Sequence, residues 1–415
     1  MKNSTRMRII RFRLISIFLC GVIAFLAGCA AEEIGYSIEN KSWDEIVDDA
    51  RGSELRWSMW GGSDVINSFV YESIGDRLKE LYDIDLYVEL VVDIALVVSR
   101  IESEVDVAPD QPGQSDLLWI NGENFKSLRE SNLLFGPYLD ILPNTQYLAE
   151  DSLDYQYDFG YPIDGYESPY GAAQFVFVYD SARMDEPPST FESLLRWIRA
   201  NPGRFTYPAP PDFVGSAFIR HVFYHALDGH QAMLIPFSDE AYEPIRDQGF
   251  RVLDIMKEYL WKKGEFYPTS MLQLDELFAN GTVDISMSYQ ANEIVQKIED
   301  GRFPDTARAF VLESGTIGNI HFVGIPINAK NIPAALVAAN LILSPEVQLE
   351  KLKYWGDLSV LSFDQLPKQW VENFEAIPTH PASVSPDTLS RVRLPEVGAD
   401  WVTALEKDWA HNYRQ

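Results

Sequence analysis

Short apolar segments alternate with helical segments along most of this chain, and this alternation limits the fold more than any other feature. Residues 55–60 alternate apolar and polar side chains as a half-buried strand does, and 61–64 form a Gly-rich loop with good helix caps. Residues 116–120 form an apolar strand that runs into 121–124 and an amphipathic helix. The alternation predicts α/β lobes, each a mostly parallel sheet flanked by helices. Ligands of such sheets bind beyond the carboxyl ends of strands, at helix N-termini.

The second half of the chain continues this pattern. Ser189-x-x-Glu192 has the spacing of a helix capping box, and 171–179 is a long apolar run. We expect a further strand at 283–289, and an Ala-rich helix at 334–343 whose successor is capped at Ser344. A chain of 415 residues that repeats such units suits two lobes rather than one small domain.

The stretch from Arg204 to Arg220 carries the strongest local signals. Residues 205–207 are aromatic and β-branched and predict the end of a strand, which the prolines at 208, 210 and 211 cannot continue. Asp212 and Ser216 are good N-cap residues for the helix that follows. A helix N-terminus after a stiff loop is a site for a small polar ligand, although an ordinary connection punctuated by proline gives the same pattern.

The first 29 residues have the features of an export signal. A basic segment up to Arg13 precedes an apolar run at 14–27, which is too short for a comfortable membrane span. Leu26-Ala27-Gly28-Cys29 closes the run like a bacterial lipobox, in which Cys29 would be lipidated. A cleaved secretory signal and an uncleaved anchor are the alternatives. Cys20 lies within this leader, so the mature chain has no cysteine pair for a disulfide.

The net charge of −28 excludes nucleic acid as a plausible partner, because a strongly acidic surface repels phosphate. No nucleophile elbow, phosphate-binding loop or His-Glu-x-x-His motif is present. His221 and His225 have a metal-compatible spacing, but no Cys or third His supports a metal there. We therefore predict no catalytic residue, no cofactor and no metal ligand.

Several motifs resemble an ABC-importer solute-binding protein. They are the lipobox, Trp60-Gly-Gly-Ser-Asp64 and Asp116-Leu-Leu-Trp-Ile-Asn-Gly-Glu123. Tyr170-Gly-Ala-Ala-Gln-Phe and the segment from Asn201 to Arg220 look like the YnjB-like branch of that family. The resemblance covers essentially the whole mature chain. It implies the two-lobed type II periplasmic-binding-protein fold, no catalysis, and a ligand cleft between lobes that the chain crosses twice, near Gln174 and near 310–320.

The resemblance also implies a division of the chain and a set of partners. We expect a lipoprotein signal peptide at 1–28, an acidic tether at 29–53, lobe 1 at 54–175, lobe 2 at 176–312, and a return to lobe 1 with C-terminal helices at 313–415. The expected partners are a small-molecule solute, ABC-transporter permease subunits, and the membrane through the Cys29 lipid. The protein is expected to be monomeric and extracytoplasmic, held on the membrane facing the periplasm or the cell surface.

The candidate ligand residues lie at or just past predicted strand ends. Aromatic side chains there can wall a cleft and stack on a cation, carboxylates can pair with it, and short polar groups can hydrogen-bond it. Core packing is the alternative for each aromatic residue, and helix capping is the alternative for the acidic and polar ones. The set is Trp60, Ser63, Asp64, Asn121, Glu123, Tyr170, Gln174, Asp212, Phe213, Ser216, Tyr289 and Gln290.

Asp64, Glu123 and Asp212 lie on three loops that carry no Lys or Arg. This charge favours a small organic cation, such as a thiamine-like vitamin or an amine, over an anion. A metal or an oxyanion remains an alternative solute, since relatives carry thiamine, polyamines, iron and oxyanions. A secreted lipoprotein hydrolase is the alternative from another functional class.

Overall fold

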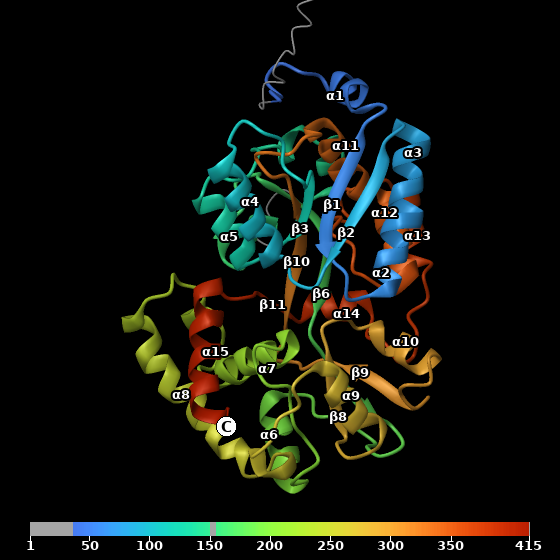
Figure 1. Cartoon of the computed structure of the whole chain (residues 1–415). Coiled ribbons are helices and arrows are strands. Elements are labelled where there is room, and N and C mark those ends of the chain that lie inside the picture. The colour runs from blue at the N-terminus through green and yellow to red at the C-terminus, as the bar shows by residue number, and fades with distance from the viewer. Residues whose placement is uncertain (1–35, 150–154, 415) are drawn as a thin grey trace, which may run out of the picture. The chain divides into compact units, whose positions relative to one another are not determined.

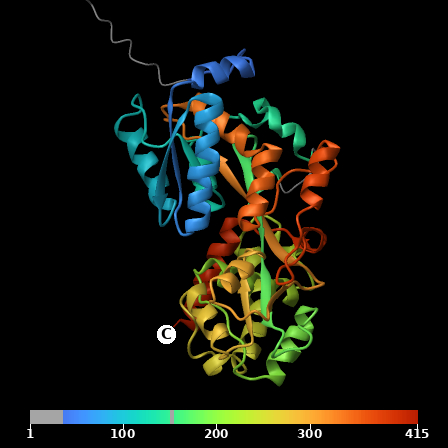
Figure 2. The ribbon, with the colours of Figure 1, turned by 90° about the vertical axis from the view of Figure 1, so that its right-hand side faces the viewer.

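The computed structural model describes residues 36–149 and 155–414. Residues 34–415 form one compact unit that contains two separate hydrophobic cores. Figure 1 and the view turned by 90° in Figure 2 both show β1–β3 gathered in one lobe and α6–α9 in the other. The predicted leader and the Cys29 lipidation site lie outside the described residues.

The first core belongs to lobe 1, whose elements come from both ends of the chain. Its sheet has the order β11-β10-β3-β1-β2, with β6 also paired to β10. The elements are α1 (Trp43–Ala50), β1 (Glu54–Trp60), α2 (Asp64–Phe69), the π-helix η1 (Val70–Gly75), α3 (Asp76–Tyr82), β2 (Asp85–Val91), α4 (Ala95–Val107), β3 (Leu117–Ile120), α5 (Glu123–Glu130), η2 (Leu139–Ile141), η3 (Pro143–Tyr147), β4 (Tyr157–Asp158), β5 (Tyr161–Pro162), β6 (Glu167–Gln174), β10 (Thr316–Gly324), α11 (Ile332–Ile342), α12 (Pro345–Trp355) and α13 (Lys368–Glu375).

The second core belongs to lobe 2 and is rich in aromatic residues. The elements around it are β7 (Val176–Asp180), α6 (Phe191–Ala200), α7 (Phe213–Ala226), η5 (Gln231–Met233), α8 (Asp239–Lys257), η6 (Trp261–Gly264), α9 (Met271–Ala279), β8 (Ile285–Ser288), α10 (Glu293–Glu299), β9 (Ala307–Phe310), α14 (Pro386–Arg391), β11 (Arg393–Leu394) and α15 (Ala399–Tyr413).

The two sheets differ in strand direction. In lobe 1, β1 pairs in parallel with β2 and β3, whereas β10 runs antiparallel to β3 and β6. In lobe 2, β7 pairs antiparallel with both β8 and β9. The expectation of a mostly parallel sheet in each lobe is therefore wrong for lobe 2, because alternation along the sequence does not fix which strands become neighbours.

The chain crosses between the lobes three times within the described ranges. The long apolar run splits at Phe175 into β6 of lobe 1 and β7 of lobe 2, and residues 311–315 lead from β9 back to β10. A third crossing at 377–382 was not expected: Phe374 lies in the first core, whereas Ala382 and Leu389 lie in the second. After it, β11 pairs with the start of β10, and α15 packs in lobe 2 through Trp401 and Trp409 among other residues.

Part of the predicted acidic tether is a folded helix. Ser42 and Glu45 form a reciprocal capping box at the start of α1, and Ile46 and Ala50 are buried in the first core. The tether prediction is therefore wrong from about residue 42 onward, because an amphipathic face hidden among acidic residues packs against lobe 1.

Two local predictions also need correction. Residues 205–207 form no strand, since the Phe205 carbonyl accepts from Trp261 N–H in a single contact instead of a ladder. The capping box of α6 is formed by Thr190 and Ser193, one residue later than Ser189 and Glu192.

Within the described part of the chain, no single helix is long and apolar enough to cross a membrane. The pair α11 and α12 passes the same test of length and composition when taken together, with a bend of 66° between the two helices.

Candidate functional site

The carboxyl ends of four strands lie at one edge of the lobe 1 sheet. β2 and β3 are parallel to β1, and β6 has the same direction because both β6 and β3 run antiparallel to β10. The segment after β6 crosses directly into lobe 2, so this edge faces that lobe. The loops at 61–63, 92–94 and 121–122 follow the other three strands at the same edge.

The loop after β1 presents an aromatic side chain. Trp60 is 44% exposed, and its ring lies against Gly62, where a Cβ atom would come within 2.0 Å. Ser63 caps α2 by accepting from Ile66 N–H, and Asp64 is exposed in the first turn. Ser63 thus has a capping function, whereas Trp60 and Asp64 reach solvent.

The loop after β3 sets the direction of α5. Gly122 has φ +61°, a conformation that suits glycine, and its N–H donates to buried Asp158 at 2.5 Å. Glu123 is the first residue of α5 and is exposed, while Asn121 is half-buried. The side chain of Glu123 is thereby placed at the edge that faces lobe 2.

Asp212 at the start of α7 is engaged by the protein itself. One carboxylate oxygen accepts from Val214 and Gly215 N–H, and the other accepts from Met271 N–H at 3.0 Å. The prediction that Asp212 contacts a ligand finds no support, because capping two helices occupies both oxygens. Gly215 is required by packing, since a Cβ there would lie 2.0 Å from the Pro208 carbonyl oxygen.

The rest of α7 forms a polar connection to α15. Ser216 donates to Glu406 at 2.5 Å and accepts from Arg220 at 2.8 Å. Arg220 is 1% exposed and makes a two-contact ion pair with Glu396, at 2.7 and 2.8 Å. This connection fixes the carboxylate of Glu406 on the lobe 2 side of the junction.

We use "charged junction" for Asp93, Glu123 and Lys126 of lobe 1 together with Asp400 and Glu406 of α15. Desolvation raises the pKa of Glu123, and repulsion from the Glu406 and Asp93 carboxylates raises it further. Lys126 Nζ lies 2.7 Å from Asp400 Oδ2 and so links α5 to α15. Figure 1 shows α5 and α15 on the same side of the crossing strands.

Three of the four carboxylates in the charged junction are in no ion pair among the residues that the structure describes. Among the described residues, Lys126 pairs with Asp400 and Arg220 pairs with Glu396. An unneutralised group of this kind, contributed by both lobes, favours a positive charge between them.

Within residues 36–149 and 155–414, three buried oxygen atoms near the crossing segments lack a hydrogen-bond partner. They are Gln174 Oε1, Asn319 Oδ1 and the Tyr289 hydroxyl, in side chains that are 2%, 6% and 7% exposed. The Gln174 N–H donates to the Tyr289 carbonyl, which places two of these residues together. Burial raises the pKa of Tyr289, and the negative charge of Glu396 raises it further while the positive charge of Arg220 lowers it. Buried oxygens without partners call for a donor from outside the chain.

Aromatic rings from both lobes line the same region. The exposed ring of Phe213 packs on Tyr289 with centroids 4.7 Å apart. On lobe 1, half-buried Trp119 packs edge-on against His321 at 5.5 Å. Burial lowers the pKa of His321 to about 4, so this ring is neutral at physiological pH.

Tyr170 and Gln290, two of the predicted ligand residues, make contacts within the protein instead. Tyr170 is fully buried between Trp57 and Trp119, with ring centroids 5.8 and 5.1 Å away, so the expectation that it walls a cleft is wrong. Every residue of β6 is buried, so Tyr170 has no face open to solvent. Gln290 is half-buried and donates to Asp357 at 3.3 Å, a contact between lobes.

Four residues of this region were missed from sequence: Asp93, Trp119, Arg220 and Glu406. Trp119 had a signal, because it lies near the end of the predicted strand at 116–120. Glu406 had none, since its position depends on how α15 packs against α7.

With this geometry in view, comparison with known proteins identifies the family. Residues 98–379 match the family described as bacterial extracellular solute-binding protein. Protein YnjB of Escherichia coli strain K12 is 37% identical over 373 residues, which is 89% of this chain and 94% of YnjB. This chain is a member of the bacterial extracellular solute-binding protein family.

Solved structures of solute-binding proteins share the fold at low identity. An ABC transporter protein from Clostridium perfringens has a TM-score of 0.61 and 16% identity over 86% of this chain and 98% of its own. The spermidine/putrescine substrate-binding protein PotD of Streptococcus pneumoniae has a TM-score of 0.61 and 15% identity over 88% and 100%. The expected type II periplasmic-binding-protein fold is confirmed. The protein is therefore an extracellular solute-binding protein.

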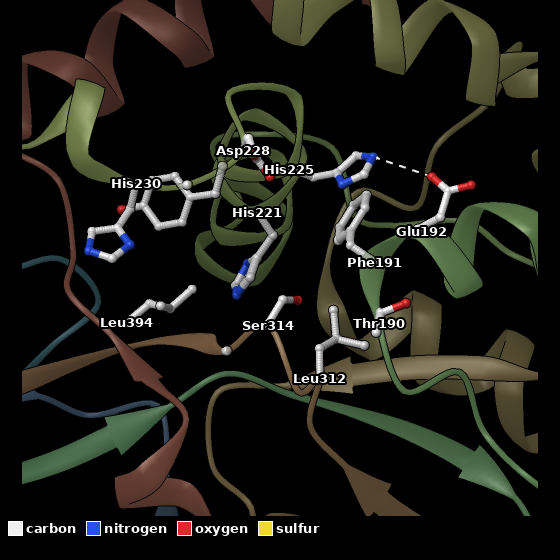
Figure 3. Close-up of a pocket in the computed structure, with 13 residues that line it drawn as sticks. Thr190, Phe191, Glu192, His221, His225, Asp228, His230, Leu312, Ser314 and Leu394 are labelled. Atoms are coloured by element: carbon white, nitrogen blue, oxygen red, sulfur yellow. Dashed lines mark ion pairs between the residues drawn. The ribbon is translucent and has the colours of Figure 1, made fainter.

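This solute-binding protein also has cavities away from the charged junction. One of about 370 Å³ in lobe 2 is lined by His221, His225 and His230, and Figure 3 shows the ring of His225 directed at Glu192, 3.9 Å away. Another, of about 440 Å³, lies between α10 and α12. None of the twelve predicted ligand residues lines either cavity.

His221 has a structural function beside the first of these cavities. Its Nδ1–H donates to the Ala217 carbonyl at 2.8 Å, and its Nε2 accepts from Ile317 N–H at 2.9 Å, at the start of β10. These two hydrogen bonds tie α7 to the start of β10, next to a crossing segment.

In the described part of the chain, no three His, Cys, Asp or Glu side chains are placed to hold a metal ion.

Proposed function

We propose that this receptor binds a small organic cation between its lobes and delivers it to the membrane permease. The observation that carries the proposal is the acidic character of the contact between α5 and α15: Lys126 and Asp400 join the two helices, and Glu123 and Glu406 on the same helices are in no ion pair among the described residues. Two carboxylates in a partly dry junction favour a positive solute and oppose an anion, each by on the order of 1 kcal/mol or more.

The neighbouring groups fit the same class of solute. The unpartnered oxygens of Gln174 and Asn319 can accept hydrogen bonds from an ammonium or amidine group. The rings of Trp60 and Phe213 are each 44% exposed and can stack on a cation, at roughly 0.5–2 kcal/mol per contact. Among the structural relatives, PotD is named for spermidine and putrescine, which are organic cations.

The oxyanion alternative is disfavoured by the start of α7. The N–H groups of Val214 and Gly215 that would hold an anion already donate to Asp212. The metal alternative lacks a cluster of ligands within residues 36–149 and 155–414. An organic cation is thus the solute class that the junction supports best.

A matched set of four-carbon solutes tests the charge preference. Putrescine, 1,4-butanediol and succinate have similar length and differ in charge from positive to neutral to negative. Thermal shift and calorimetry on residues 34–415, which form a compact unit, would measure each, with thiamine as an aromatic cation. A cation at 100 times its dissociation constant is expected to stabilise the protein by about 2.7 kcal/mol. Tighter binding of succinate or a metal, unchanged in Glu406→Gln, would contradict the proposal.

We further propose that Cys29 carries a lipid that holds the receptor on the membrane. The support is the basic and apolar leader that ends in Leu26-Ala27-Gly28-Cys29. A protein with two or more acyl chains stays attached to a bilayer, whereas one chain is marginal. Cys29→Ser is expected to release folded protein from the membrane fraction. A mature N-terminus at another residue, without lipid, would rule the anchor out.

A further inference from the structure

The cavity of about 440 Å³ between α10 and α12 has walls from both lobes. Trp355 and Phe374 of its lining belong to the first core, whereas Ala291 and Leu389 belong to the second. Residues 377–380 of the third crossing complete the lining. Figure 1 shows α10 and α13 on one side of the crossing strands, with α5 and α15 on the other. The α10–α12 cavity is therefore separate from the charged junction, and its shape depends on both lobes.

The lobes touch at the edge of this cavity. Gly356 has φ +76°, and a Cβ atom there would lie 1.8 Å from Asn292 Nδ2, so Asn292 of lobe 2 packs directly on the end of α12. The next residue of lobe 1, Asp357, accepts from Gln290 of lobe 2 at 3.3 Å. Leu358 lines the cavity and packs against both cores. A molecule in the cavity would therefore contact both lobes where they meet.

The inner wall of the cavity suits an apolar ring. Its buried members are Trp355, Phe374 and Leu389, and half-buried Val295 and Leu352 extend it. A volume of about 440 Å³ lies in the range of small-molecule pockets. The Trp355 indole N–H has no hydrogen-bond acceptor within residues 36–149 and 155–414. A buried donor of this kind calls for an acceptor such as a carbonyl oxygen.

The charged groups of the lining balance each other. Glu299 and Lys353 are exposed and opposite in sign. Asn292 and Gln296 are half-buried amides, which can both donate and accept hydrogen bonds. An ion would lose hydration without meeting an excess of the opposite charge, whereas an amide group matches the polar wall.

We propose that the α10–α12 cavity is a second ligand site, which takes an uncharged ring compound with a carbonyl or amide group and holds the lobes in the arrangement that forms it. The ring fills the apolar wall, and the carbonyl accepts from the Trp355 N–H. The amide N–H groups of the ligand donate to the side-chain oxygens of Asn292 and Gln296. This site does not depend on the charge of the solute in the charged junction.

Occupancy of the cavity and movement of the lobes are linked. A ligand shifts a conformational equilibrium only by its difference in affinity for the two states. An occupant that contacts α10 and α12 at once loses one of these walls when the lobes move apart there. It therefore favours the arrangement in which Asn292 packs on Gly356. The linkage is reciprocal, so a solute that moves the lobes changes the affinity of the cavity for its ligand.

Three fluorinated probes of one shape test the ligand class. 4-Fluorobenzamide is neutral, 4-fluorobenzoate is negative and 4-fluorobenzylamine is positive, and fluorine NMR would measure the binding of each to residues 34–415. The amide is expected to bind about five-fold more tightly than either ion, because an ion loses hydration without gaining a partner. Equal affinity for the three probes, or no binding of the amide, would overturn the inference.

A matched pair of tryptophan substitutions locates the site. Ser383→Trp fills the α10–α12 cavity, whereas Ser314→Trp fills the cavity of about 370 Å³ in lobe 2. Ser383→Trp should abolish the binding of 4-fluorobenzamide, and Ser314→Trp should leave it unchanged. Gln296→Trp fills the same cavity from α10 and serves as a second variant if Ser383→Trp does not fold. Binding that survives filling of the cavity in a folded variant would place the probe elsewhere and contradict the proposal.

Spin labels test the link to lobe movement. Residues 34–415 contain no cysteine, so Ser131→Cys and Asn412→Cys, both exposed, can carry labels at the end of α5 and on α15. Pulsed electron paramagnetic resonance would measure the distance between the labels with and without 4-fluorobenzamide. The probe should narrow the distribution of distances in the wild type and have no effect in Ser383→Trp. An unchanged distribution with the probe bound would show that the cavity does not control the lobes.

Discussion

Two ion pairs lie near the contacts between the lobes, and they differ in burial. Lys351 and Asp357 pair at 2.8 Å with side chains 0% and 2% exposed, and Asp357 also accepts from Gln290 of lobe 2. Lys126 and Asp400 pair at 2.7 Å on the surface, next to Glu123 and Glu406. Two Lys–Asp ion pairs of similar length therefore differ in how firmly they hold the lobes. The buried pair is a fixed part of the crossing region, whereas the surface pair can break and reform as the lobes move.

The largest expected effect follows from breaking the buried pair. Lys351→Met leaves the Asp357 carboxylate unpaired in the interior and removes a contact of Lys351 with the Tyr170 carbonyl. The cost is expected to be about 3–5 kcal/mol, measured by urea unfolding. Lys353→Met, on the exposed face of the same helix, is the control and should change stability by less than about 0.5 kcal/mol. A loss below about 1 kcal/mol for Lys351→Met would mean that the pair does not stabilise the crossing region.

Acid should loosen the crossing region through His221. Burial lowers the pKa of His221 to about 3, and its unprotonated Nε2 accepts from Ile317 N–H. Because the folded pKa is depressed, this contribution to stability is fully present above about pH 6.5 and is lost as pH falls toward 3. The expected slope is about 1.4 kcal/mol per pH unit within that window.

Unfolding of wild type and His221→Leu at a series of pH values isolates this slope from the many titrating carboxylates. The variant should be less stable at pH 7, since Ile317 N–H loses its acceptor, but its stability should fall less steeply with acid. Parallel curves for the two proteins would show that His221 does not titrate in this way.

The smallest stability effect is expected at the surface pair. Lys126→Gln should cost less than about 1 kcal/mol of unfolding free energy, because both partners reach solvent. It should nevertheless reduce the closed fraction of the ligand-free protein, and 0.5 M salt should shrink the difference from wild type. A loss of several kcal/mol of unfolding free energy would show that the Lys126–Asp400 pair stabilises the fold as a buried ion pair does.

The sequence predicted much of the local architecture because helix starts and strands have local signals. Asp212 and Ser344 cap α7 and α12 as expected, and β1 and β3 lie where the apolar segments predicted strands. The family resemblance supplied the fold as a whole. Local signals could not give strand pairing in lobe 2, which depends on neighbours far apart in the sequence.

The candidate site was harder to predict because orientation is a tertiary property. Asp212 had the right residue type, but its two oxygens turn to backbone N–H groups. Tyr170 had the right position along the chain, but both faces of β6 are covered. Glu406 follows only from the packing of α15 against α7, which no local pattern reveals. Glu123 is the one predicted carboxylate that the structure places in the charged junction.

Proton release on solute binding tests the central claim most directly, namely that carboxylates of both lobes hold a cation. The raised pKa of Glu123 in the empty protein should fall when a positive charge binds beside it, so binding should expel protons and strengthen as pH rises through that pKa. Calorimetry of putrescine or thiamine in two buffers of different ionisation enthalpy counts these protons. We expect release in the wild type and its loss in Glu123→Gln. Affinity that does not change with pH, or that rises as pH falls, would contradict the account.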